Sequence, residues 1–158
     1  MLVYWFPMGN HVDDEVWVLG DISWYGATKT MEVFGRLKGR KFLCAGNHDG
    51  KLLRNDGVRG LFGEVVDYKE ITVRNTGVVL CHYPIPCYNG HFRGWVHLYG
   101  HVHVGDEWAI MKACQREIRR KYTSRMYNVG CMVPGMDYTP RTLTEILGMY
   151  EVGDGQRE

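Results

Sequence analysis

Four polar motifs, each placed where an apolar run ends, constrain this 158-residue chain more than any other feature. The motifs are Gly20-Asp21, Gly46-Asn47-His48-Asp49, His82 after Leu80-Cys81, and Gly100-His101-Val102-His103. Short runs rich in apolar, β-branched and aromatic residues are typical of buried strands. We therefore expect each motif to lie at the end of a strand. Except before His82, where Cys81 takes its place, a glycine lets the backbone turn sharply toward a shared site.

Strand-like and helix-like segments alternate along the chain. Strands are expected over 16–19, 41–45, 65–73, 78–82, 95–99 and 126–129, and helices over 28–37, 106–121 and 143–150, with a short helix within 51–63. The Arg-Asn-Thr-Gly segment 74–77 between two strand-like runs is a hairpin signal. This pattern predicts an α/β fold with two mixed sheets packed face to face and flanked by helices. The length fits a single domain over 1–158, with 153–158 as a frayed polar tail.

The side chains of the four motifs are those of a metal site. Neutral imidazole, carboxylate and amide oxygen suit Zn, Mn or Fe. A carboxylate can bridge two cations about 3.5–4 Å apart, and such a pair stabilises both oxygens of a phosphoryl displacement. The alternative for any histidine is a structural role in the core or a loop. We assign that role to His97, which has no glycine turn beside it.

In their order and spacing, the motifs resemble those of the calcineurin-like metallophosphoesterases. The likeness extends over roughly residues 14–147 and includes a closing strand and helix from Tyr127-Asn128-Val129-Gly130 onward. It implies the family's four-layer α-β-β-α sandwich. It also implies hydrolysis of a phosphomonoester or phosphodiester by metal-activated water, with two divalent cations drawn from Mn, Fe, Zn, Co or Ni.

The resemblance assigns a role to each motif. Asp21 would bridge the two metals, and Asn47, His82 and His101 would complete the shell of one of them. His103 would bind the other metal. His48 would not be a ligand but would act beside the phosphate as a general acid or charge stabiliser.

The chain departs from the family at its start. Family members open with a strand that ends in Asp-x-His and supplies two ligands to the metal that His103 binds, and this sequence contains no such tripeptide. Residues 1–16 resemble the end of the family's first helix and the loop after it. We therefore expect a fold without the first strand, in which the second metal keeps only Asp21 and His103.

The cluster His11, Asp13 and Asp14 has suitable side chains but does not replace the missing pair. It precedes the strand that leads to Asp21, so it enters at the opposite end, roughly 20 Å away. Asp13 and Asp14 are thus expected to be solvated turn residues. Two explanations remain for the gap. Either the chain starts downstream of the opening strand, which we favour because its loss would expose sheet edges, or the protein is a natural variant with an impaired second site.

Composition excludes several other classes. Nineteen basic and 18 acidic side chains give a net charge of +1, so no overall field indicates a nucleic-acid or membrane partner. Five cysteines without a Cys-x-x-Cys pair indicate neither a disulfide framework nor a zinc ribbon, and we expect a cytoplasmic protein. No apolar run is long enough to span a bilayer.

Three function classes follow from these features. The motifs favour a phosphoesterase acting on a phosphate-ester substrate. The absent Asp-x-His favours a truncated or degenerate domain that binds one metal and does not catalyse. A nucleic-acid binder using the basic residues of 116–125 is weaker, because the helix dipole accounts for basic side chains in a last turn.

Overall fold

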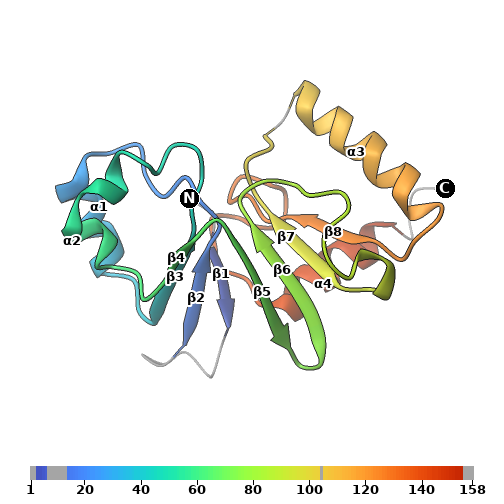
Figure 1. The fold of residues 1–158 in the computed structure, drawn as a ribbon, viewed down its shortest axis with the longest axis horizontal. Coiled ribbons are helices and arrows are strands. Elements are labelled where there is room, and N and C mark those ends of the chain that lie inside the picture. The colour runs from blue at the N-terminus through green and yellow to red at the C-terminus, as the bar shows by residue number, and fades with distance from the viewer. Residues whose placement is uncertain (1–2, 7–13, 104, 155–158) are drawn as a thin grey trace.

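Two mixed sheets form the centre of the molecule in the computed structural model, which describes residues 3–6, 14–103 and 105–154 (Figure 1). The first sheet has the order β1 (Val3–Phe6), β2 (Glu15–Val18), β3 (Arg40–Cys44) and β4 (Val65–Val66). The second has the order β5 (Tyr68–Val73), β6 (Thr76–Cys81), β7 (Val96–Tyr99) and β8 (Arg125–Asn128). In each sheet the first pair of strands is antiparallel and the others are parallel.

Helices lie outside the two sheets. The described helices are α1 (Ala27–Gly35), α2 (Asp56–Arg59), α3 (Asp106–Arg119) and α4 (Leu143–Asp154), with 3-10 turns η1 (Leu52–Arg54) and η2 (His91–Arg93). Helices α1 and α2 flank the first sheet, and α3 lies beyond the second (Figure 1). The predicted class, an α/β sandwich of two sheets flanked by helices, is confirmed.

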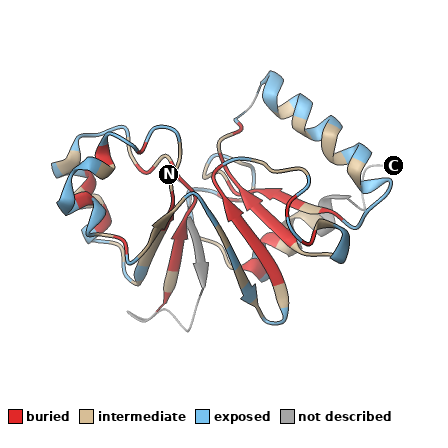
Figure 2. Cartoon of the chain, in the orientation of Figure 1, coloured by how far each residue is buried: buried red, intermediate tan, exposed pale blue. Residues whose placement is uncertain are grey.

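Strand residues alternate between the core and the helix layers, as the period of two requires. The central core contains side chains from both sheets, closed by α4: Trp17, Cys44, Val78, Leu80, Val96, Leu98, Leu143 and Ile146. The intervening residues Val18 and Leu43 pack with Phe34 of α1 and Val58 of α2. On the far side of the second sheet, Val79 belongs to a cluster that Trp108 and Met111 of α3 cover. Strands β6 and β7 are buried over most of their length (Figure 2).

The start of the chain differs from the prediction. Residues 3–6 form β1, antiparallel to β2, with Val3 opposite Val18 and Phe6 opposite Glu15. The expectation of a helix end and loop over this stretch is therefore wrong. The run Val-Tyr-Trp-Phe consists of β-branched and aromatic residues, which favour strands, and β1 covers the edge of β2.

Two further details correct the predicted pattern. Asp14 is 2% exposed and its carbonyl oxygen accepts the Arg40 N–H at 2.7 Å, so it is a buried strand-entry residue and not a solvated turn residue. His11 and Asp13 lie outside the described residues. The single strand expected over 65–73 is divided between β4 and β5, which belong to different sheets. The hairpin is confirmed: Arg74 and Asn75, with φ of 46° and 68°, form the turn between β5 and β6.

His97 of β7 is a structural histidine, as predicted. Its ring is buried, its Nδ1–H donates to the Val79 carbonyl at 3.1 Å, and its Nε2 accepts the Ile85 N–H at 3.0 Å and lies 3.2 Å from the Tyr83 carbonyl. The rings of Tyr88 and Tyr99 pack against it. Burial raises the pKa of both tyrosines, so no charge faces the imidazole from them. The contacts therefore suit a neutral ring with one protonated nitrogen.

We expect acid to destabilise the fold through His97. Burial lowers the pKa of His97 from 6.5 to about 4. Between these values the unfolded state binds a proton that the folded state does not, so stability falls as the pH drops from 6.5 toward 4. The loss at pH 4.5 relative to pH 7.5 is about 2–3 kcal/mol. Urea unfolding of the parent and of His97→Gln at both pH values measures it. The variant should show the smaller pH difference, and equal differences would contradict the assignment.

No helix in the described ranges combines the length and the apolar character that crossing a membrane requires.

Candidate metal centre

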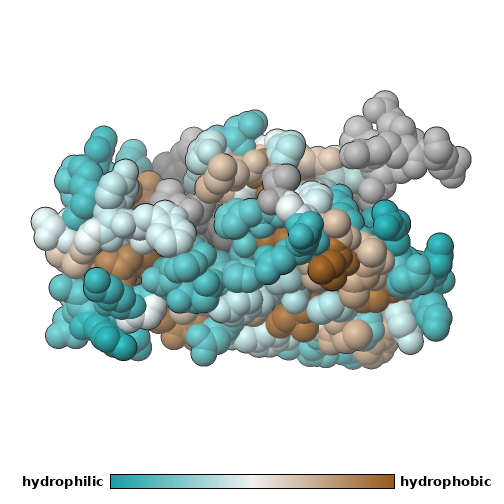
Figure 3. Space-filling model, turned by 90° about the horizontal axis from the view of Figure 1, so that it is seen from above, coloured by the Kyte–Doolittle hydropathy of each residue, from teal (hydrophilic) through white to brown (hydrophobic). Residues whose placement is uncertain are grey.

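Two pairs of parallel strands, one pair in each sheet, bring the predicted ligands to one side of the molecule. Asp21 follows β2, Asn47 follows β3, His82 follows β6 and His101 follows β7. The first two strands belong to one sheet and the last two to the other, so the group lies where the two sheets meet. The face onto which these strand ends point is largely hydrophilic (Figures 1 and 3). The predicted placement of the motifs at strand ends is confirmed.

The donor atoms of these side chains lie close together. His82 Nε2, Asn47 Oδ1 and His101 Nδ1 are each 3.1 Å from the other two. The Asp21 Oδ2 atom is 3.6 Å from His82 Nε2. Ligand atoms bound about 2.1 Å from one ion lie roughly 3.0–3.4 Å apart. These spacings fit donors that share a cation.

The hydrogen bonding of His82 supports the same interpretation. Its Nδ1 lies 2.8 Å from the Leu19 carbonyl, which can only accept, so this nitrogen carries the proton. Nε2, the nitrogen on the other side of the ring, faces the amide oxygen of Asn47 and the carboxylate of Asp21. In this tautomer Nε2 presents a lone pair beside two oxygen acceptors, an arrangement that a bound cation would stabilise. A backbone carbonyl that orients the ring through its other nitrogen is also the usual support of a metal-bound histidine.

The amide of Asn47 is an essential part of this group. Among the described residues, no three or more His, Cys, Asp and Glu side chains form by themselves a group that could hold a metal ion. The Asn47 oxygen is the atom that contacts both histidines. The candidate centre therefore depends on a neutral amide oxygen as well as on imidazole and carboxylate, a donor set that suits Mn, Fe or Zn.

Protonation and backbone geometry both favour ligation. Burial and the neighbouring His82 lower the pKa of His101, which favours the neutral imidazole that binds metals. Asp21 and His101 have φ values of 52° and 61°, in the left-handed region that side chains other than glycine avoid. Such residues cost roughly 1–3 kcal/mol each and cluster at functional sites.

His48 and His103 occupy different positions from the four grouped side chains. The His48 N–H donates to Asp21 Oδ1 at 3.1 Å, while its ring is exposed and lies 4.4 Å from the Trp24 ring. His103 is exposed on the loop after His101 and makes no hydrogen bond or ion pair with another described residue. The structure therefore brings together Asp21, Asn47, His82 and His101, and it leaves His103 outside that group.

Asp49 is the functional residue that the sequence prediction overlooked. Its side chain is 0% exposed and accepts three backbone N–H groups, from Asp21 at 2.9 Å, Ile22 at 2.8 Å and Gly46 at 2.7 Å. The turn after β2 is thus fastened to the turn after β3. The sequence signal was its place directly after His48, but its partners lie up to 28 residues away in the chain.

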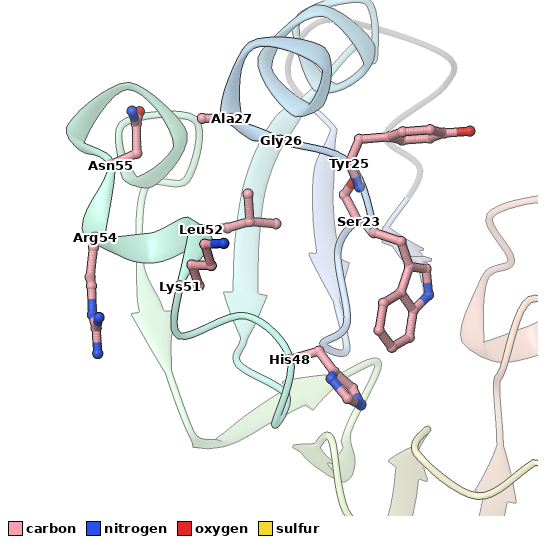
Figure 4. A pocket seen from close by; sticks show the side chains of 10 residues that line it. Ser23, Tyr25, Gly26, Ala27, His48, Lys51, Leu52, Arg54 and Asn55 are labelled. Atoms are coloured by element: carbon pink, nitrogen blue, oxygen red, sulfur yellow. The ribbon is translucent and has the colours of Figure 1, made fainter.

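Two aromatic residues beside the centre were also missed. The ring of Tyr83, which follows His82, lies 5.0 Å from His82 and 4.8 Å from His101. Trp24 is 77% exposed and belongs to the wall of a pocket of about 560 Å³, which His48 also lines. The pocket lies between residues 23–27, at the start of α1, and residues 48–55 after β3 (Figure 4).

Comparison with known proteins supports the fold and brings no function. The chain is similar to the crystal structure of AQ665 from Aquifex aeolicus, a protein of unknown function. The sequences are 26% identical, the TM-score is 0.52, and the match covers 74% of this chain and 67% of that one. No protein-family model and no curated protein matches this chain. The chemistry of the site therefore has to be argued from its own side chains.

Proposed function

We propose that this protein is a metal-dependent phosphoesterase of the calcineurin-like type, which hydrolyses a phosphomonoester or phosphodiester. The observation that carries the proposal is the mutual 3.1 Å spacing of His82 Nε2, Asn47 Oδ1 and His101 Nδ1 beside the Asp21 carboxylate. The cofactors would be divalent cations such as Mn, Fe, Zn, Co or Ni. When bound, they supply a lowered pKa for water and offset the charge of the phosphate.

The chain's own residues divide the remaining work. Leu19 fixes the tautomer of His82 through its carbonyl, so that Nε2 is free to bind a cation. His48 is fastened to the Asp21 carboxylate through its backbone, and its exposed ring can donate a proton to a leaving oxygen. None of the five cysteines, all of which lie in the described residues, forms a disulfide, and this supports a reducing compartment, the cytoplasm, as the site of action.

A second candidate function is a domain that binds one metal and does not catalyse. It is favoured by the position of His103, which forms no hydrogen bond or ion pair with the other described ligands. In that case the cation would join the turns of both sheets and stabilise the fold.

Metal content and hydrolysis separate the two candidates. The protein is loaded with Mn²⁺, passed through a desalting column, and analysed by mass spectrometry of the metal, with bis(p-nitrophenyl) phosphate as the substrate. About two metals per chain with turnover supports the enzyme. One metal without turnover supports the structural role, and a chain that retains no metal would refute both.

Replacement of His48 tests the assigned division of labour. We expect His48→Ala to lower turnover by about a hundredfold, because a positioned proton donor contributes that much or more. Metal content should stay unchanged, because the His48 ring is not among the grouped donors. His91→Ala, in η2, is the matched histidine control and should change neither quantity. Parallel loss of metal and activity in His48→Ala would make His48 a ligand instead.

A further inference from the structure

The pocket beside the candidate centre has the size and the walls of a ligand site. Its volume of about 560 Å³ lies within the range of small-molecule pockets, roughly 300–1,000 Å³. His48 stands at one end, and its loop also carries Asn47. Because the His48 N–H is hydrogen-bonded to Asp21 Oδ1, a molecule bound there could place one phosphate at the metal centre while the rest of it occupies the pocket.

Trp24 provides an aromatic platform at the end of the pocket near His48. The indole is 77% exposed, and its ring contacts the His48 ring with centroids 4.4 Å apart. Tyr25, the next residue, directs its ring away from the other labelled side chains (Figure 4). The exposed indole is thus the aromatic surface available to a flat ligand, and stacking on such a surface is independent of base identity.

The opposite wall of the pocket is cationic. Lys51 and Arg54 line it, and the lining contains no acidic residue. Both side chains are exposed, and neither forms an ion pair with a residue in the described ranges. By contrast, the nearby Lys29 of α1 is paired with Glu32 at 2.8 Å. Two cations that form no ion pair within the described ranges favour a ligand with an anionic group at that end of the pocket.

We infer that the pocket binds a nucleotide phosphodiester that carries a second phosphate. The scissile phosphate lies at the metal centre beside His48, one base stacks on Trp24, and the second phosphate lies against Lys51 and Arg54. This inference rests on the proposed function and names its substrate class.

Binding to the metal-free protein tests the pocket without requiring turnover. Calorimetric titrations in EDTA use three probes: the dinucleotide pApA, the same dinucleotide without its terminal phosphate (ApA), and inorganic phosphate. The parent protein should bind pApA most tightly. Trp24→Ala should weaken pApA binding by about tenfold and should fold normally, because the indole is exposed. Phe92→Ala, which removes an exposed aromatic in η2, is the matched control and should have no effect.

The cationic wall is tested by a double substitution. Lys51→Gln with Arg54→Gln should abolish the preference for pApA over ApA, whereas the charge-matched pair Arg36→Gln with Lys38→Gln, at the far end of α1, should preserve it. Equal binding of pApA and ApA by the parent protein, equal binding of pApA and phosphate, or an unchanged Trp24→Ala would each overturn the inference. Hydrolysis of bis(p-nitrophenyl) phosphate without binding of pApA would refute the pocket and leave the proposed function intact. Binding of pApA by a protein that hydrolyses nothing would refute the proposed function alone.

Discussion

Replacement of Gly46 with alanine is expected to destabilise the fold by about 3 kcal/mol, because no space exists for the added methyl group. A Cβ at this position would collide with the Oδ1 atom of Asp21 and lie 2.8 Å from the Asp21 backbone nitrogen and 2.9 Å from His82 Cε1. The obstacles include backbone, so the strain cannot be relieved by rotation of one flexible side chain. Asp21 and His82 would be pushed apart, and we expect Mn²⁺ affinity to fall by about a hundredfold as well.

Gly50, four residues further along the same loop, is the matched control. A Cβ on Gly50 would have no heavy atom within 4 Å, so Gly50→Ala should leave both quantities nearly unchanged. Urea unfolding measures stability, and calorimetric titration with Mn²⁺ measures affinity. If Gly46→Ala were as stable and as tight-binding as Gly50→Ala, the close packing of the two turns would be wrong.

The features that the sequence predicted correctly depend on local rules. Strands β2, β3, β6 and β7 are short apolar runs, and each is followed by a turn with a polar side chain. Both signals lie within a few residues of each other in the sequence, so each strand and its turn can be predicted without knowing which segments they contact in the fold. The carboxyl ends of parallel strands then bring Asp21, Asn47, His82 and His101 to one place as a matter of topology.

The features that were missed depend on contacts between distant segments. Asp14 is buried because Gly39 and Arg40 pack against it. The residues around Asp14 in the sequence do not predict this contact. The division of 65–73 into β4 and β5 likewise depends on which sheet offers an edge, since both halves have strand-forming residues. The pocket is lined by two segments more than 20 residues apart in the chain, so its volume and its cationic lining exist only in the folded state.

The candidate centre stores strain that other interactions must support. Asp21 and His101 both adopt left-handed backbone conformations. A fold that keeps this arrangement needs strong fixation of the turns, and the buried carboxylate of Asp49 is the group placed to provide it.

Removal of that carboxylate should therefore have a large effect on stability. Asp49→Ala leaves the N–H groups of Asp21, Ile22 and Gly46 without their acceptor, and we expect a loss of about 4 kcal/mol. Asp49→Asn keeps one acceptor oxygen and the shape of the side chain, so its loss should be about half as large. Asp67→Ala removes an exposed carboxylate between β4 and β5 and should stay within about 0.5 kcal/mol of the parent.

Measurement of Mn²⁺ affinity shows whether Asp49 positions the metal-binding turns or only stabilises the fold. If Asp49 holds Asp21 in position, Asp49→Asn should weaken Mn²⁺ binding by about tenfold even at temperatures where the variant is fully folded. A destabilising core substitution remote from the turns, such as Ile146→Val in α4, should lower the unfolding midpoint and leave Mn²⁺ affinity unchanged. Equal Mn²⁺ affinity in Asp49→Asn and Ile146→Val would mean that the buried carboxylate stabilises the fold without setting the geometry of the centre. The contrast between these two variants thus separates the effect of Asp49 on the geometry of the metal centre from its effect on the stability of the fold.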